Sequence, residues 1–309
     1  MKAEQLRTHG DLTRTSRPSP SARRHGSSPA IAVVSDGSAL TDAHPAVRAA
    51  ATESLLGDWA AVIRDQAGLI ARPLNLLARN ADDPSPSLRA LPQDVRGVIV
   101  VGTDPAHCGA VGIWAADRQC VMVTDREITA VAAAAELLTF LSRRGLPPSR
   151  SRVLIAGAAS CPLLRGLLVA AGVSEVISWD RRDTAAFPLH HVIPHAGIVI
   201  DLVGCSQELA DAACEHPDLI VMTPDGRQPP TGTLPSVLHA MVGGTHSVMS
   251  VAGYYSCLMS LVAGTPPDQP GHHARGGLPW RQRSLRRTAA RGNARGIREG
   301  ERSETGAGR

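Results

Sequence analysis

The chain has 309 residues and a formal net charge of +4, with 43% apolar and 3% aromatic residues. This length is enough for two domains, and the core must be built from Ala, Val, Leu and Ile. Lys2 is the only lysine, which excludes catalysis by a lysine in the globular body. The richest apolar run, 130–141, is too short to span a membrane, and we find no signal peptide, so we expect a soluble cytoplasmic protein.

The first half of the chain alternates between predicted strands and helices. Residues 1–29 are rich in Ser, Pro, Arg and Gly, which predicts disorder. A β-rich run at 30–39 ends in Asp-Gly, and apolar residues on one side predict a helix from Pro45 to Gly68. We expect a strand at 69–77 and a loop at 82–87.

Two buried strands and a long helix complete this half. The strands are predicted at 95–102 and 120–125, where apolar residues are almost continuous. The helix is predicted at 126–145 and stops at Gly145. Pro147 and Pro148 then break the chain.

The second half begins with a βαβ unit at 153–180. Further strands are predicted at 196–204 and 218–226, with a helix between them at 207–216 and a last apolar helix at 246–262. Alternating strands and helices indicate an α/β protein with parallel sheets. We therefore predict a smaller α/β domain followed by a Rossmann-like NAD(P)-binding domain, and two basic, disordered tails. The predicted bounds are 1–29, 30–145, 146–265 and 266–309.

The tails carry the positive charge. Residues 271–309 contain ten Arg and three Glu, whereas residues 30–270 have a net charge of −7. Solvated tails on an acidic body are the plainer interpretation. The alternative is an interaction protein that binds nucleic acid through the Arg-rich segment 275–302.

The turn of the βαβ unit is a candidate dinucleotide site with a damaged motif. A dinucleotide turn uses three glycines, for the turn itself, for approach of the pyrophosphate and for helix packing. Here those positions hold Ala156, Ala158 and Cys161, and only Gly157 remains as glycine. Two interpretations remain: the turn binds a phosphate at the helix N-terminus, or the βαβ unit binds no nucleotide and serves only to build the core.

An acid at the end of the second strand supports the nucleotide alternative. Asp180 lies 23 residues after Gly157, where an acid can bind a ribose diol, while the Arg181 that follows favours a 2′-phosphate. NAD and NADP are therefore both candidate cofactors. The candidate cofactor-binding residues are Gly157, Ala158, Ala159, Ser160, Cys161, Asp180 and Arg181.

Cysteines and histidines give two further hypotheses. Cys161 at a helix N-terminus is either a thiol of lowered pKa or a small residue in a glycine position. The segment HHVIPH at 190–195 is either a transition-metal site or a loop with structural or surface histidines. None of the six cysteines forms a CxxC pair, so a zinc site is not predicted.

Several segments resemble the malic enzymes, which oxidatively decarboxylate malate with NAD or NADP and a divalent metal. AVVSDGSA (32–39) resembles the family's VVTDGTA, and CVMVTDREITAVAAAAELL (120–138) resembles VFHDDQHGTAIVVLAALL. LLVAAGVSEVISWDRRD (167–183) resembles LLLAAGVKDVIVVDRKG, and the segments at 55–68, 95–105 and 246–262 follow in the family's order. The likeness covers about 30–265 and implies the family's fold and a homodimer or a paralogous partner.

The sequence departs from the family at the positions of its catalytic residues and metal ligands. The resemblance implies a Lys base in the MEGKA helix, where this chain has Gly57-Asp58-Trp59. It implies a Tyr acid before the first strand, and no Tyr precedes Ile31. The Glu-Asp metal ligands are replaced by Gly102-Thr103, and the later Asn pair by His246-Ser247.

Asp125 is the one metal ligand of the family that is kept, with Asp104 one step beyond the missing pair. Mg²⁺ or Mn²⁺ needs more oxygen ligands than this, and a helix N-cap is the plainer role for Asp125. We therefore predict no catalytic residue and a regulatory or structural protein. The alternative is an active NAD(P)-dependent oxidoreductase for malate or a related 2-hydroxy acid.

Overall fold

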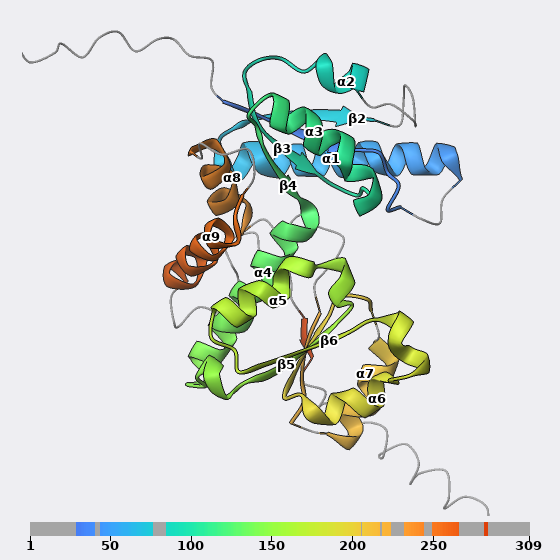
Figure 1. Ribbon diagram of the computed structural model, residues 1–309, viewed down its shortest axis with the longest axis vertical. Helices are drawn as coiled ribbons and strands as arrows, with labels where there is room; N and C mark the ends of the chain where they lie inside the picture. The colour runs from blue at the N-terminus through green and yellow to red at the C-terminus, as the bar shows by residue number, and fades with distance from the viewer. Residues whose placement is uncertain are drawn as a thin grey trace, which may run out of the picture.

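The computed structural model describes residues 29–40, 44–76, 85–204, 206–216, 218–223, 232–243, 249–265 and 281–283. Within these residues the chain forms two sheets, one above the other in Figure 1, with helices around and between them. The predicted α/β class with parallel sheets is confirmed.

The first sheet is wholly parallel and has the strand order β2-β1-β3-β4. Every residue of the central strand β1 is buried, as expected for a parallel sheet covered on both faces. The strands are β1 Ala30–Ser35, β2 Ile70–Asn75, β3 Val95–Val100 and β4 Val121–Thr124.

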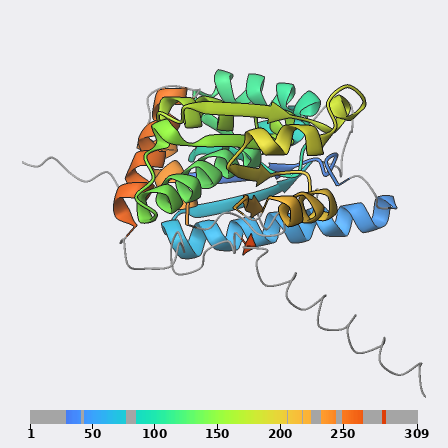
Figure 2. The same cartoon turned by 90° about the horizontal axis from the view of Figure 1, so that it is seen from below.

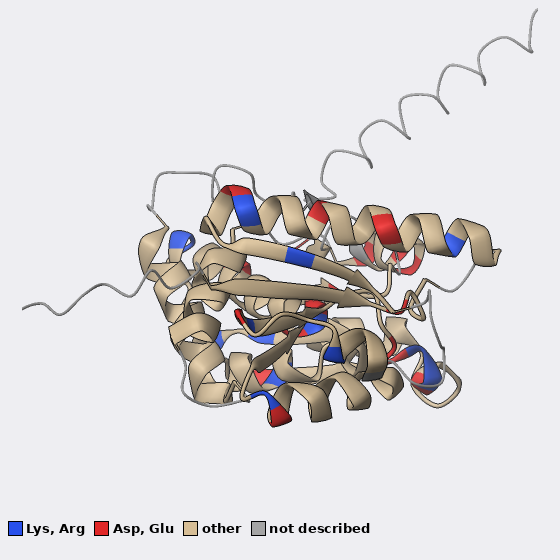
Figure 3. Ribbon diagram, turned by 90° about the horizontal axis from the view of Figure 1, so that it is seen from above, with Lys and Arg blue, Asp and Glu red and all other residues tan. Residues whose placement is uncertain are grey.

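Alternate residues of β1 pack on different helices. Ile31 and Val33 belong to the same buried cluster as the apolar side of α1 (Pro45–Ala67). Ala32 and Val34 pack in a second cluster with residues of α2 (Ser85–Arg89) and α3 (Cys108–Asp117). α1 carries acidic and basic residues along its length (Figure 3).

The second sheet has the order β6-β5-β7-β8-β9, in which only β9 is antiparallel. One face packs on α4 (Asp125–Arg143) and α5 (Pro162–Ala170), and the other on α6 (Leu189–Val192) and α7 (Ser206–Glu215). The strands are β5 Arg152–Ala156, β6 Glu175–Trp179, β7 Ile198–Asp201, β8 Ile220–Thr223 and β9 Arg281–Arg283.

Helix α4 (Asp125–Arg143) lies between the two sheets and is buried at every residue from Ala130 to Leu141. A helix that is apolar all round belongs in the interior. The last two helices, α8 (Leu234–Gly243) and α9 (Val251–Gly264), return to this region after the second sheet. They lie together at one side of the molecule (Figures 1 and 2).

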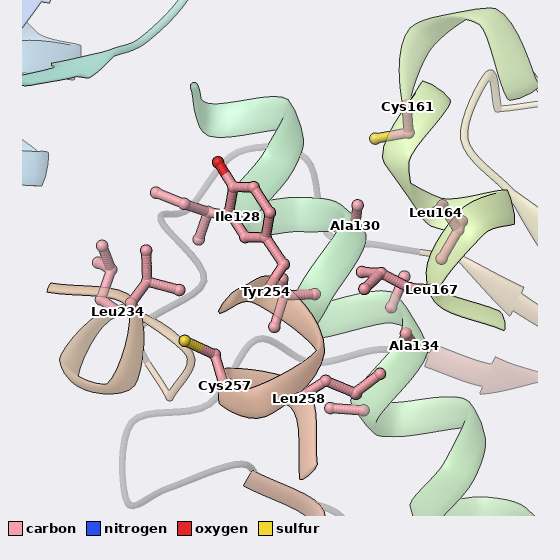
Figure 4. Close-up of a cluster of buried hydrophobic side chains, with 14 of the residues drawn as sticks. Ile128, Ala130, Ala134, Cys161, Leu164, Leu167, Leu234, Tyr254, Cys257 and Leu258 are labelled. Carbon is pink, nitrogen blue, oxygen red and sulfur yellow. The ribbon is translucent and has the colours of Figure 1, made fainter. Parts of the chain in front are cut away.

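The packing around α4 joins both halves of the chain. Leu258 of α9 approaches α4 from one side, and Leu164 and Leu167 of α5 approach it from another (Figure 4). One buried cluster therefore contains residues of α1, both sheets, α4, α5, α8 and α9. The domain boundary at 145 stays a prediction, which unfolding experiments can test.

The structure differs from the predicted elements in five places. Residues 85–87, predicted as loop, begin α2, while 82–84 lie outside the described residues. The sequence patterns predicted neither α3 nor α8. The segment 190–195 forms α6 and a 3₁₀ turn, Ile193–His195, instead of a loop. Within the predicted basic tail, Arg281–Arg283 forms β9.

The leader 1–28 and most of 266–309 lie outside the described residues. In the described part, no helix is long and apolar enough to cross a membrane.

Candidate functional site

A cleft of about 290 Å³ lies between the carboxyl end of the first sheet and the start of α5. Three segments line it: the loop after β3, the junction of β4 with α4, and the turn before α5. Ligands of open α/β sheets bind outside the carboxyl ends of the strands, so this cleft is the candidate site. Its lining residues are Val100, Thr103, Pro105, Cys108, Thr124, Asp125, Arg126, Glu127, Ala159, Cys161, Pro162 and Leu163.

Of the predicted dinucleotide residues, Ala159 and Cys161 line this cleft, and Gly157 begins the turn that carries them. Gly157 has φ +90°, a conformation that other residues rarely adopt. A Cβ atom on Gly157 would lie 2.5 Å from Cγ1 of Val203, which follows β7. The remaining glycine is therefore required both by the backbone of the turn and by close packing of the loop after β7.

Hydrogen bonds within the turn use the N–H groups that a pyrophosphate would need. Ala158–Ser160 forms a 3₁₀ turn, in which the N–H of Ser160 donates to Gly157 O and that of Cys161 to Ala158 O. Pro162, the first residue of α5, has no N–H. The turn therefore presents few donors to a ligand and fits a pyrophosphate poorly.

Asp180 reaches this turn from the end of β6. Its carboxylate accepts from the N–H of Ala159, at 3.0 and 3.2 Å for the two oxygens, and its own N–H donates to Asp183. Arg181, the first residue of the following 3₁₀ turn, is exposed. Asp180 is thus near the position expected for a ribose ligand, but its carboxylate is already hydrogen-bonded to the backbone of the turn at Ala159.

Cys161 is a structural residue in this geometry. Its side chain is buried, and its thiol donates to Arg126 O at 3.2 Å. Burial raises the pKa of Cys161 to about 12, with a further contribution from Asp125. A thiol with this pKa is protonated at neutral pH, which favours the role of a small residue in a glycine position over that of a nucleophile.

Asp125 is the first residue of α4, and the predicted N-cap role belongs instead to Thr124. The Thr124 hydroxyl accepts from Glu127 N, and the Glu127 carboxylate accepts from Thr124 N at 2.7 Å. Asp125 Oδ2 accepts from Gly102 N at 2.8 Å, which ties α4 to the loop after β3. Burial raises the pKa of Asp125, although this hydrogen bond and Arg126 oppose the shift.

These residues do not fit a divalent metal. An oxygen of Asp125 is occupied by the Gly102 N–H, and the Arg126 guanidinium lines the same cleft. Among the described residues, no three His, Cys, Asp or Glu side chains are grouped to hold an ion. His246 and Ser247 lie outside the described residues.

The sequence patterns missed two charged residues of the site, Arg126 and Glu127. Arg126 lines the cleft and donates a long hydrogen bond of 3.5 Å to Thr103 O. Glu127 lines it as well and is hydrogen-bonded to the hydroxyl of Tyr254, a buried residue of α9. The Thr124-x-x-Glu127 spacing is a capping-box signature and was a usable signal for Glu127.

The histidines of 190–195 lie away from the cleft. His190, His191 and His195 are exposed, and His190 and His191 contact each other edge to face with ring centroids 4.2 Å apart. None of them lines the cleft. The surface interpretation is the one that agrees with this geometry.

Several malic enzymes of known structure have a similar fold. The NAD-dependent malic enzyme of Thermotoga maritima is 17% identical with a TM-score of 0.60, over 78% of this chain and 79% of that one. The Entamoeba histolytica enzyme is 16% identical with a TM-score of 0.59, over 78% of this chain and 64% of that one. The Pyrococcus horikoshii enzyme is 15% identical with a TM-score of 0.57, over 87% and 77%.

These likenesses confirm the resemblance predicted from the sequence at the level of the fold. No family model and no curated protein matches the sequence.

Proposed function

We propose that this chain uses the malic-enzyme fold without catalysing oxidative decarboxylation of malate, and that it acts as a regulatory or structural protein. The observation that carries the proposal is the state of the ionisable groups in the cleft. Asp125 is held by Gly102, and Glu127 by Thr124 and Tyr254. Each carboxylate already has a structural partner.

Oxidation of a hydroxy acid requires a group that removes the hydroxyl proton beside a hydride acceptor. Arg126 cannot accept a proton, because guanidinium groups stay protonated in proteins. Burial raises the pKa of Cys108 and of Cys161, so both thiols are protonated. The cleft therefore supports binding and packing better than malate chemistry.

The direct test is an assay of the full-length chain with malate, Mn²⁺ and either NAD or NADP, followed at the absorbance of the reduced cofactor. We expect no malate-dependent reduction, while the Thermotoga maritima malic enzyme, run in parallel, reduces NAD. Turnover that disappears in Asp125→Ala would show a working active site in this cleft and would overturn the proposal.

Cofactor binding is tested separately by thermal shift of the same protein with NAD or NADP. A ligand at 100 times its Kd stabilises the folded state by about 2.7 kcal/mol. We expect no shift, because the N–H groups of the turn are used within the turn. A shift abolished by Asp180→Ala would place a nucleotide at this turn and make the chain a nucleotide-responsive protein.

A structural or regulatory protein acts through a partner, and a second copy of the chain is the first one to test. Light scattering of the purified full-length protein separates a monomer from a homodimer. A monomer would direct the search to a paralogous chain.

A further inference from the structure

The first sheet has a topological switch point beside the cleft described above, and the loop after β3 borders both. The chain passes from β1 to β2 on one side and then returns to β3 on the other side of β1. In open parallel sheets, ligands bind in the crevice at the carboxyl ends of the two strands that flank such a point. Here those strands are β1 and β3, which are paired in parallel.

The loops that follow these two strands are fastened to each other. Ala39 N donates to Gly102 O at 3.1 Å, and Asp36 N donates to Thr103 Oγ1 at 3.3 Å. In the opposite direction, Asp104 N donates to Ser38 Oγ at 2.7 Å. Three hydrogen bonds across the switch point hold the side chains of both loops in a defined arrangement.

At this position the two loops bring a carboxylate and an imidazole together. Asp36 Oδ2 lies 2.7 Å from His107 Nδ1, and Asp36 Oδ1 accepts from the N–H and the hydroxyl of Ser38. Although burial alone would raise it, these hydrogen bonds leave the pKa of Asp36 below its usual value. An ionised carboxylate only accepts hydrogen bonds, so Nδ1 of His107 carries the proton.

In a proton-transfer pair the orienting carboxylate is enclosed and the imidazole is open to solvent, and Asp36 and His107 differ in this way. The Asp36 side chain is 21% exposed and that of His107 is 58% exposed. The carboxylate is therefore largely enclosed, whereas the ring that carries the remaining nitrogen, Nε2, is open to solvent. A carboxylate on Nδ1 fixes the tautomer and makes Nε2 the proton acceptor.

We propose that Asp36 and His107 form a proton-transfer site at the switch point of the first sheet, acting on uncharged esters or hydroxyl compounds. Asp104, Asp125 and Asp36 surround this region and act electrostatically on Cys108, the residue after His107, with Arg126 as the one opposing cation among these groups. This excess of carboxylates disfavours dianions such as malate.

Hydrolysis of an activated aryl ester at this site needs no reactant other than water. His107 Nε2 takes a proton from water while the water oxygen bonds to the carbonyl carbon. The bond from carbon to the aryl oxygen then breaks, the phenolate leaves, and the imidazolium returns its proton to solvent. Asp36 orients the ring and stabilises the imidazolium.

The site is independent of the proposed function. Pro105 and Cys108 line the cleft between the sheets, but His107 between them does not. Absence of malate oxidation and activity at His107 are therefore separate results.

The first experiment measures carbethoxylation of individual histidines by diethyl pyrocarbonate, using the full-length protein and peptide mass spectrometry. His239 is the matched control, because it is exposed and its Nδ1 lies 2.6 Å from a neutral carbonyl, Pro235 O. We expect His107 to react faster at the high-pH limit, and Asp36→Asn to slow it about threefold or more while His239 is unchanged. An unchanged rate at His107 in folded Asp36→Asn would overturn the proposal.

The second experiment measures hydrolysis of p-nitrophenyl acetate and does not depend on the folding of the Asp36 variant. We expect His107→Gln to lower the second-order rate constant about tenfold relative to the wild type, after subtraction of hydrolysis by the buffer. His239→Gln should leave the rate constant unchanged. Equal rate constants for the wild type and His107→Gln would contradict the assignment.

Discussion

Glu136 is a buried carboxyl in the middle of α4, with only 4% of its surface exposed. Burial raises its pKa from 4.5 to about 7, and Arg143 partly opposes the shift. The folded state therefore holds a proton on Glu136 at pH values where the unfolded chain has lost it. The contribution of this group to stability is greatest below the unfolded pKa and is lost as the pH rises through 7.

Replacing Glu136 by Gln should remove this dependence on pH. At pH 8 we expect Glu136→Gln to be more stable than the wild type by on the order of 2–3 kcal/mol, with little difference at pH 4.5. Urea denaturation at both pH values measures the difference, and the exposed Glu53→Gln on α1 is the control. The same increment at both pH values would show that ionisation of Glu136 is not the cause.

Gly157 is the residue on which the turn of the βαβ unit depends. Its φ is +90°, and Val203 Cγ1 lies only 2.5 Å from the position that a Cβ atom would take, so Gly157→Ala should destabilise the fold by about 1–3 kcal/mol. Val203→Ala in the same chain should recover part of this loss, because it removes the steric contact but not the backbone strain. Gly166→Ala on α5, where a Cβ meets no atom within 4 Å, should be neutral or stabilising. Urea denaturation of the three variants measures these differences.

At the scale of the element, the capping box of α4 defines where the helix begins and which residues face the cleft. The Thr124 hydroxyl and the Glu127 carboxylate satisfy N–H groups of the first turn reciprocally. Asp125 and Arg126 are placed at the cleft by this start, one residue earlier than the sequence predicted. The capping box at the N-terminus of α4 thus decides which residues of this helix line the cleft.

Thr124→Ala should cost about 1 kcal/mol, the usual value for loss of an N-cap, and Thr124→Ser should restore most of it. Thermal or urea denaturation provides the comparison. Hydrogen exchange should also show faster exchange at the N-terminal turn of α4 in Thr124→Ala. Unaltered exchange there would mean that the cap does not hold this helix terminus.

At the scale of the whole molecule, α4 connects the two sheets because it is buried on all sides. Leu137 and the residues around it belong to a cluster that reaches β1 of the first sheet and β5 of the second. Opening either sheet exposes this cluster to water, at a cost that rises with the apolar area exposed. We therefore expect the described body to unfold in one transition in spite of its two sheets.

Three described tryptophans report on the two sheets, because Trp59 of α1 is buried in the cluster that contains Ile31 and Val33 of β1. Trp114 packs beneath the first sheet and Trp179 on the second. Fluorescence of the double variant Trp59→Phe/Trp114→Phe and of Trp179→Phe should give the same midpoint in urea, and Leu137→Ala should lower both midpoints together. Two separated midpoints would indicate domains that unfold independently at the predicted boundary.

Prediction from the sequence succeeded where the signal is local. Continuous apolar runs predicted β3 and β4, and the 3.6-residue pattern between Pro45 and Gly68 predicted α1. It failed for α3, whose sequence Cys108–Asp117 contains two glycines together with Cys, Val, Ile and Trp, which have weaker helical preference than its alanines. That helix is stabilised by Val111 and Trp114 packing against the first sheet, a contact that sequence periodicity does not reveal.

The candidate site was predicted in part. Gly157, Cys161, Asp180 and Asp125 were identified because they occupy motif positions, and Asp125 and Cys161 line the cleft together. Asp36 and His107 are 71 residues apart in the chain, and no motif joins them. Their pairing follows from the order of strands in the first sheet.

The sequence alone determined the α/β class, the positions of the parallel strands and the absence of any lysine beyond Lys2. These properties depend on residue type and local spacing, which are visible in one dimension. The tertiary structure decided which N–H groups of the nucleotide turn are already used, that α4 is enclosed by both sheets, and that Asp36 meets His107. Each of these is a contact between segments brought together only when the strands are ordered in their sheets.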